Sequence, residues 1–213
     1  MNTKEQFVIT ISRELGSGGR TVGRKLAEKL EVRYSDKELI KALRDKFNLT
    51  PSGIERLKGE KKSWLADFIK IAAPYPKADV FNDNNTVLEY RPDVTTDDVF
   101  TAEKEILTEL AAESSCVIAG RSGFFVFKDH PNKLDVFITA SRGNRIRRVM
   151  AKQGLNEELA AETIDKVDAQ RDNYVKRYTG KSRYDARNYD LCLNADNHSE
   201  DELVDIILKY IGN

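Results

Sequence analysis

The sequence has few of the residues that build metal centres and disulfide frameworks. Its 213 residues include only two cysteines and two histidines. Cys116 and Cys192 do not form a CxxC pair, which excludes the usual zinc and disulfide patterns. Both lie in apolar, strand-like runs, so we predict buried core thiols. His130 and His198 stand in polar, turn-like sequence without metal-ligand spacing, and we predict that they lie at the surface.

The chain also lacks an excess of one charge and a long apolar run. Lys+Arg and Asp+Glu each number 35, so the net charge gives no sign of a nucleic-acid or membrane partner. No apolar stretch approaches the length of a membrane span, and the amino terminus lacks the apolar core of a signal peptide. We therefore expect a cytoplasmic protein that binds neither nucleic acid nor membrane. The sequence gives no indication of its oligomeric state.

One stretch near the amino terminus predicts a strand, a glycine turn and a helix. It reads "ITISRELGSGGRTVGRKLAEKL" and begins at Ile9. Residues 7–11 are β-branched or aromatic, and apolar residues recur at helical spacing after the turn. The turn contains Gly16, Gly18 and Gly19, which can adopt positive φ and let a ligand approach the backbone. Since free N–H groups at a helix start favour anions, the pattern predicts a phosphate site. A turn without a ligand is the alternative.

A turn of this kind ordinarily carries a lysine, which is absent here. Aligned with the usual turn, Gly19 falls at the lysine position and Arg20 follows it. We predict that Arg20 replaces the lost charge by bending back over the glycines, with Arg13 and Arg24 as alternatives. The helix dipole disfavours a cation at a helix start unless an anion neutralises it, which favours a phosphate partner.

Further apolar runs predict four more buried parallel strands, at residues 32–36, 116–120, 134–140 and 189–194. Helical patterns separate them. One helix is predicted to begin at Thr95 or Thr96. The last helix is predicted to begin at Ser199, which has capping-box spacing to Glu202, and to end at Gly212. The alternation predicts one α/β layered domain over residues 1–213.

Two segments are too long for simple crossovers between strands. Residues 37–94 contain helical pieces and a turn-rich stretch, and we predict an inserted cap. Residues 142–187 carry twelve Lys/Arg against seven Asp/Glu, and we predict a mobile flap that receives something anionic. A solvated, charge-rich helix pair is the alternative for this second segment.

Charged residues follow several predicted strands where those strands end. Asp36 ends the second, Arg121 follows the third, and "ASRGNRIRR" follows the fourth. Parallel strands of such a sheet bring their carboxyl ends to one ligand-binding crevice. This crevice would then contain a phosphate-binding turn, a carboxylate and several arginines. Such a set of groups suits the transfer of a phosphoryl group between two anionic molecules. A helix cap at Asp36 and a surface ion pair at Arg121 are the alternatives.

These motifs together resemble the cytidylate kinase-like family of P-loop nucleoside monophosphate kinases. The resemblance rests on "SRELGSGGRTVG" followed by "YSDKELI", on "GRSGFFVF" with "LDVFITASRGNRIRR", on "GLNEELAAETIDKVDAQRDNYVKRYTG" and on "NYDLCLN". It extends over nearly the whole chain. It implies a five-stranded parallel sheet of order 2-3-1-4-5, with an acceptor-binding insertion at residues 37–94 and a lid at residues 142–187.

The resemblance also implies a reaction and a set of site residues. ATP with Mg²⁺ would phosphorylate a nucleoside monophosphate, with CMP as the expected acceptor. Asp36 would hold magnesium-bound water or the acceptor, and Arg121 would grip the acceptor phosphate. Arg171 and Arg177 would close over the transferring group. The donor ATP would contact Gly16, Ser17, Gly18, Gly19, Arg20 and Thr21 through its phosphates, and Arg142 or Arg145 beside its adenine.

Ser122 departs from the family pattern, because better-known cytidylate kinases have an acidic residue directly after this arginine. This departure leaves the base specificity open. Three alternatives to a CMP kinase remain. The first is a kinase of the same fold with another small acceptor. The second, suggested by the missing lysine, is a nucleotide-binding regulatory or scaffold protein without turnover. The third is a nucleic-acid-binding protein that uses the basic lid, which the neutral overall charge disfavours.

Overall fold

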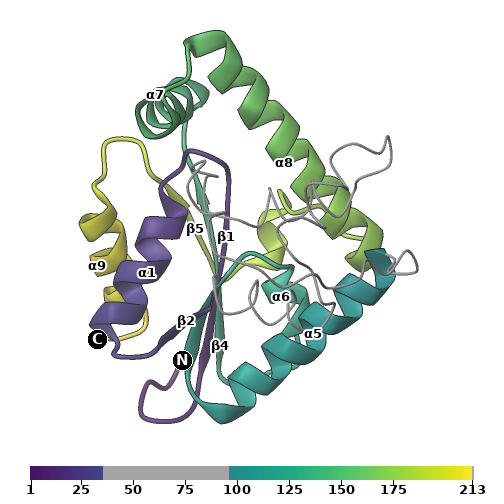
Figure 1. Cartoon of the computed structure of the whole chain (residues 1–213). Coiled ribbons are helices and arrows are strands. Elements are labelled where there is room, and N and C mark those ends of the chain that lie inside the picture. The colour runs from purple at the N-terminus through teal and green to yellow at the C-terminus, as the bar shows by residue number, and fades with distance from the viewer. Residues whose placement is uncertain (36–95, 213) are drawn as a thin grey trace, which may run out of the picture. The chain divides into compact units, whose positions relative to one another are not determined.

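The computed structural model describes residues 1–35 and 96–212 (Figure 1). The chain divides into two compact units, one of which joins Met1–Ser35 to Thr108–Asn213. This unit contains a five-stranded parallel sheet of order β2-β3-β1-β4-β5, which is the predicted order. The strands are β1 (Val8–Arg13), β2 (Arg33–Ser35), β3 (Cys116–Ala119), β4 (Lys133–Thr139) and β5 (Leu191–Asn194).

The helices of the described residues alternate with these strands as the sequence predicts. They are α1 (Gly19–Lys29), α5 (Thr96–Glu113), α6 (Gly123–Val126), α7 (Arg142–Gln153), α8 (Glu157–Thr179) and α9 (Glu200–Tyr210). A short 3-10 turn, η2 (Ala186–Asn188), precedes β5. Asp36 and the predicted insertion at residues 37–94 lie outside the described residues. No helix that the structure describes is long and apolar enough to cross a membrane.

The central strand β1 contacts a different helix through each of its faces, because successive side chains of a strand point to opposite sides. Ile11 faces α1, where its side chain approaches Gly23. Thr10 faces α6, where its side chain approaches Gly123. Figure 1 shows α1 and α9 together on one side of the sheet and α6 on the other. Glycines at both contacts let the helices approach the strand closely.

The larger apolar core lies between the sheet and the helices α1 and α9. Its fully buried members include Ile9, Ile11, Val22, Leu26, Leu203, Val204 and Ile207. The predicted capping box begins α9. The hydroxyl of Ser199 accepts from the N–H of Glu202 at 3.2 Å, and the Glu202 carboxylate accepts from the N–H of Ser199 at 2.7 Å. This cap fixes where α9 starts, so its apolar stripe faces α1.

The two cysteines differ in exposure, so the prediction of buried thiols is wrong for one of them. Cys116 opens β3 in the sheet interior, and burial raises the pKa of its thiol to about 11. Cys192 is exposed. It lies on β5, an edge strand whose residues alternate between half-buried and exposed. His198 is exposed as predicted, whereas His130 is half-buried and accepts from the N–H of Asn132 at 3.2 Å.

The predicted flap at residues 142–187 consists mainly of the helix pair α7 and α8. Gly154, with φ of 68°, ends α7, and the side chain of Asn156 caps the start of α8. Gly180, also with φ of 68°, ends α8. A small buried cluster of Val149, Ala160 and Ile164 joins the two helices. That this segment moves as a lid stays a prediction.

Candidate active site

The glycine turn, residues 14–19, leads from β1 into α1 with two residues in the left-handed region. Gly16 has φ of 84° and Gly18 has φ of 83°. The N–H groups of both have no acceptor within residues 1–35 and 96–212. The first turn of α1 contains no acidic side chain. N–H groups without an acceptor, next to the start of a helix, suit an anion such as phosphate.

The hydroxyl of Ser17 stabilises this turn from within. Ser17 is fully buried, and its Oγ donates to the carbonyl oxygen of Glu14 at 3.0 Å while accepting from the N–H of Gly19 at 3.4 Å. Thr21 donates its N–H to the carbonyl oxygen of Gly18 at 2.9 Å, which starts the helix. The N–H of Ser17 also donates to the carbonyl oxygen of Glu14, at 3.3 Å, so both its side chain and its N–H are used inside the turn. A contact of Ser17 with a donor phosphate stays a prediction.

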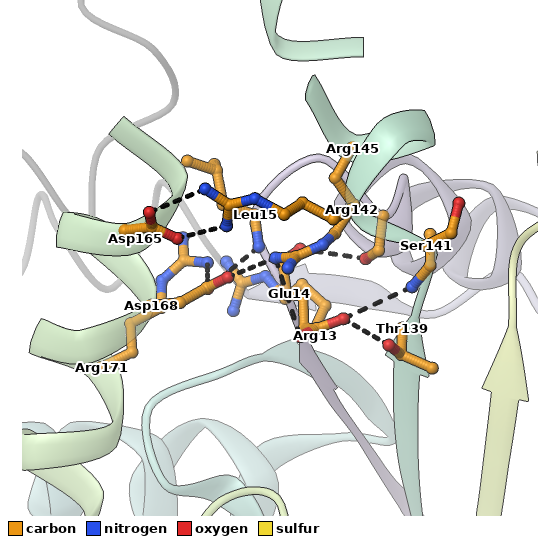
Figure 2. A network of polar contacts seen from close by, with 12 residues as sticks. Arg13, Glu14, Leu15, Thr139, Ser141, Arg142, Arg145, Asp165, Asp168 and Arg171 are labelled. Atoms are coloured by element: carbon orange, nitrogen blue, oxygen red, sulfur yellow. Dashed lines mark hydrogen bonds and ion pairs between the residues drawn. The ribbon is translucent and has the colours of Figure 1, made fainter. Parts of the chain in front are cut away.

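A buried carboxylate, Asp168 on α8, holds the turn from the side (Figure 2). It is 6% exposed and accepts from the N–H of Leu15 at 3.1 Å. Arg145 donates to its Oδ2 at 2.6 Å. Nη1 of Arg171 and Nη1 of Arg183 each lie 3.6 Å from its Oδ1. One carboxylate thus joins the glycine turn to arginines from α7, from α8 and from the segment after α8.

The first turns of α7 support the back of the glycine turn. A Cβ atom on Gly16 would lie 2.6 Å from the carbonyl oxygen of Arg145, so a larger residue would push the two segments apart. Glu14 lies 3.7 Å from Arg145 Nη1 and accepts from the hydroxyl of Thr139 (Figure 2). Arg148 donates to the carbonyl oxygen of Ser17 at 3.0 Å. The turn is therefore held in shape by side chains from three neighbouring elements.

Arg142 and Arg145, both predicted to lie beside adenine, have different surroundings. Arg142 forms a two-pronged ion pair with Asp165 at 2.5 and 2.8 Å, at the surface (Figure 2). The hydrogen bonds of this pair raise the pKa of Arg142 and lower the pKa of Asp165. Arg145 is buried, and its head is committed to Asp168. A place beside the adenine stays a prediction for both.

Arg121 follows β3 in an unusual backbone conformation. Gly120, Arg121 and Ser122 have φ of 78°, 60° and 53°, so three consecutive residues are left-handed. Such backbone is costly for residues other than glycine and is characteristic of functional sites. The segment lies at the carboxyl end of a strand that pairs with β1, beside the glycine turn. This is the predicted location of Arg121; its role at the acceptor phosphate stays a prediction.

The arginines of α1 and of the predicted lid are spread over several environments. The carbonyl oxygen of Arg20 accepts from the Tyr34 hydroxyl at 3.1 Å. Arg24 pairs with Glu28 at 2.5 Å on the exposed face of α1, which is a helix-surface role. Arg171 faces Asp168, whereas Arg177 is exposed, with its guanidinium 5.4 Å from the Tyr178 ring. Of the two predicted lid arginines, only Arg171 lies beside the glycine turn.

The described residues provide no ready magnesium site. Residues 1–35 and 96–212 contain no cluster of three His, Cys, Asp or Glu side chains suited to a metal. Glu14 within the glycine turn accepts from Thr139, and Asp168 beside the turn is paired with arginines. The predicted ligand, Asp36, lies outside the described residues. Because Mg²⁺ in kinases is held largely by substrate phosphates, one further carboxylate can suffice.

Sequence reasoning missed Asp168 and Arg148. The sequence of α8 does contain a signal for Asp168, because it lies at helical spacing from apolar residues. The buried residues of α8 are Ala160, Ile164, Asp168 and Val175. An acidic residue within a buried helical stripe requires a partner, and here the partners are arginines. Arg148 gave no such signal, since it lies among three other arginines of α7 that have the same sequence character.

Comparison with known proteins agrees with this fold. The model of the cytidylate kinase-like family matches residues 8–197. The chain belongs to the cytidylate kinase-like family. Cytidylate kinase of Methanocorpusculum labreanum is 30% identical over 203 residues, which cover 93% of each chain. Membership of this family indicates ATP-dependent phosphoryl transfer, so the family member described here is a kinase.

Solved structures share its fold. An uncharacterized protein from Eubacterium ventriosum has a TM-score of 0.69 at 25% identity, covering 97% of this chain and 98% of the other. Shikimate kinase from Bacteroides thetaiotaomicron has a TM-score of 0.55 at 15% identity, covering 97% and 99%. The second likeness shows the fold alone, which is the P-loop kinase fold predicted from the sequence.

Proposed function

We propose that this kinase phosphorylates a nucleoside monophosphate, with CMP as the first candidate acceptor and ATP as the donor. The observation that carries the proposal is that two candidate anion-binding segments follow neighbouring strands. The glycine turn follows β1, and its Gly16 and Gly18 N–H groups have no acceptor among the residues that the structure describes. Arg121 follows β3 in a left-handed segment. A donor phosphate on the first and an acceptor phosphate on the second would face each other across one crevice.

In this mechanism the protein aligns the reactants and balances their charge. The N–H groups of Gly16 and Gly18 bind donor phosphates, and Arg121 holds the acceptor phosphate with its planar fork. Arg171, whose Nη1 lies 3.6 Å from Oδ1 of Asp168, would move from this carboxylate to the transferring phosphoryl group. Asp36 is the candidate ligand for magnesium, which would supply positive charge to balance the donor phosphates. No described side chain needs to form a covalent bond.

An acceptor panel tests the proposal directly. The purified protein is incubated with ATP, Mg²⁺ and one candidate acceptor at a time, and ADP formation is measured. The panel contains CMP, dCMP, UMP, AMP, GMP, shikimate and gluconate. We expect CMP or dCMP to give the highest kcat/KM. Turnover of shikimate or gluconate alone would make the protein a kinase of another acceptor, and ATP binding without any turnover would make it a regulatory binder.

We expect the carboxyl-terminal half of α8 to become ordered when both substrates bind. The amino-terminal half packs on α7 through Val149, Ala160 and Ile164, whereas residues 176–181 carry exposed positive charges before and after Gly180. Like charges repel until phosphates bridge them, so binding should close this part as a lid.

Hydrogen–deuterium exchange measures this closure. We compare the free protein with the protein bound to a non-hydrolysable ATP analogue and the acceptor that the panel identifies. Exchange across residues 172–184 should slow, while exchange in α9 serves as the internal control. Unchanged exchange from residue 156 to residue 184 would show that this segment is not a lid.

A further inference from the structure

The side chain of Arg13, the last residue of β1, occupies the space beside the first residue of α1. A Cβ atom on Gly19 would lie 2.6 Å from Cβ and 3.2 Å from Cγ of Arg13. These atoms form the base of the arginine side chain, which cannot move away unless β1 moves with it. Gly19 begins a helix and is not left-handed, so its backbone alone would accept another residue. The stem of Arg13 is therefore what excludes a side chain at position 19.

The head of Arg13 reaches the end of the neighbouring strand. A Cβ atom on Gly120 would overlap Nη1 of Arg13, so the guanidinium lies directly against this glycine. Arg121 is the next residue along the chain. The side chain of Arg13 thus extends from the start of α1, where donor phosphates are proposed to bind, to the segment proposed to hold the acceptor.

These contacts explain an exchange of residues within the phosphate-binding motif. The usual motif is G-x-x-x-x-G-K-[ST], with a lysine that reaches the β- and γ-phosphates. Gly18 and Gly19 stand at the positions of its last glycine and its lysine, so Arg13 stands at the position of its first glycine. The chain has a cation where the motif has glycine, and glycine where the motif has a cation.

We infer that Arg13 supplies the charge of the missing lysine and binds the phosphoryl group that passes from donor to acceptor. Its guanidinium is planar, permanently charged and able to bind two oxygens at once. Its place along the sheet edge is stabilised by Arg183, which donates to the carbonyl oxygen of Arg13 while its own side chain is 5% exposed beside Asp168. This inference favours Arg13 over Arg20 as the replacement for the lysine.

The test combines single variants with a variant that restores the usual motif. Arg13→Ala should weaken ATP binding by about tenfold or more and lower kcat by about a hundredfold or more. Gly19→Lys alone should have a lower melting temperature and little activity, because the two side chains compete for one space. The double variant Arg13→Gly/Gly19→Lys re-creates G-x-x-x-x-G-K and should regain both melting temperature and ATP affinity relative to Gly19→Lys.

Arg33→Ala is the matched control, since Arg33 pairs with Glu113 at the opposite end of the sheet and should bind ATP as the wild type does. The turnover measurement rests on the proposed function, whereas titration of Mg²⁺-ATP binding and the melting temperatures do not. A wild-type protein that binds ATP without phosphorylating any acceptor would contradict only the proposed function. Normal ATP binding by Arg13→Ala, or loss in Arg20→Ala without loss in Arg13→Ala, would overturn the inference about Arg13.

Discussion

Asp168→Ala is expected to lower the free energy of unfolding by about 3–5 kcal/mol, because removing one partner of a buried ion pair leaves an uncompensated charge. The head of Arg145 would lose its 2.6 Å partner, and the N–H of Leu15 would lose its acceptor. Arg171 and Arg183 would lose the charge that lies 3.6 Å from each of them. Chemical denaturation followed by circular dichroism measures the change.

Asp165→Ala provides the matched control for this prediction. Asp165 lies on the same helix and also pairs with an arginine, but both side chains of that pair are more than half exposed. Water and salt screen such a pair, so the unfolding midpoint should hardly change. Asp168→Asn separates charge from hydrogen bonding, since an amide can still accept from Leu15. Equal stability of the Asp168→Ala and Asp165→Ala variants would show that the buried carboxylate does not hold the turn.

Arg121→Ala is expected to lower kcat/KM for the acceptor by about a hundredfold or more, which corresponds to about 3 kcal/mol of transition-state binding. Arg121 lies at the carboxyl end of β3 in a segment of three left-handed residues, so its backbone direction is set by the fold. The affinity for ATP should stay nearly unchanged, because the glycine turn is formed by other residues.

Steady-state kinetics at varied acceptor concentration, together with ATP titration, measures the effect of Arg121→Ala. Arg121→Lys keeps the charge but removes the planar fork, and it should recover only part of the activity if two oxygens are bound at once. An unchanged acceptor KM and kcat in Arg121→Ala would rule out its contact with the acceptor. A loss of ATP affinity of the same size would place Arg121 on the donor side instead.

Local sequence patterns were enough to predict most of the strands and the glycine turn between β1 and α1. Short apolar runs predict buried strands well when strands are parallel and covered on both faces, as at Val8, Val117 and Val136. The same rule predicted the wrong exposure for Cys192, because β5 is an edge strand and one of its faces is open. The strand order itself came from the family resemblance, since apolar runs do not reveal which strands pair.

The network around Asp168 shows what the sequence leaves out. The charges of α7 and α8 are typical of solvated helices, and Arg142 with Asp165 is such a surface pair. Asp168 lies one helical turn later, with the same residue type, yet it is buried against the glycine turn. Only the packing of α8 against residues far away in the sequence distinguishes the two. The contact of Arg13 with Gly19 has the same origin, because it depends on how β1 meets α1.

The close packing of Arg13 against Gly19 and Gly120 also limits the order in which substitutions at positions 13 and 19 can occur during evolution. A chain with a lysine at position 19 has no room for an arginine at position 13, because both side chains need the same space. The lysine must therefore disappear before the arginine arrives, or both must change together. The reverse change meets the same steric conflict, because a lysine cannot return to position 19 while an arginine occupies position 13. If Arg13 replaces the lysine as inferred above, genome surveys that require the lysine as proof of a working kinase would discard chains whose cation lies at the end of the preceding strand.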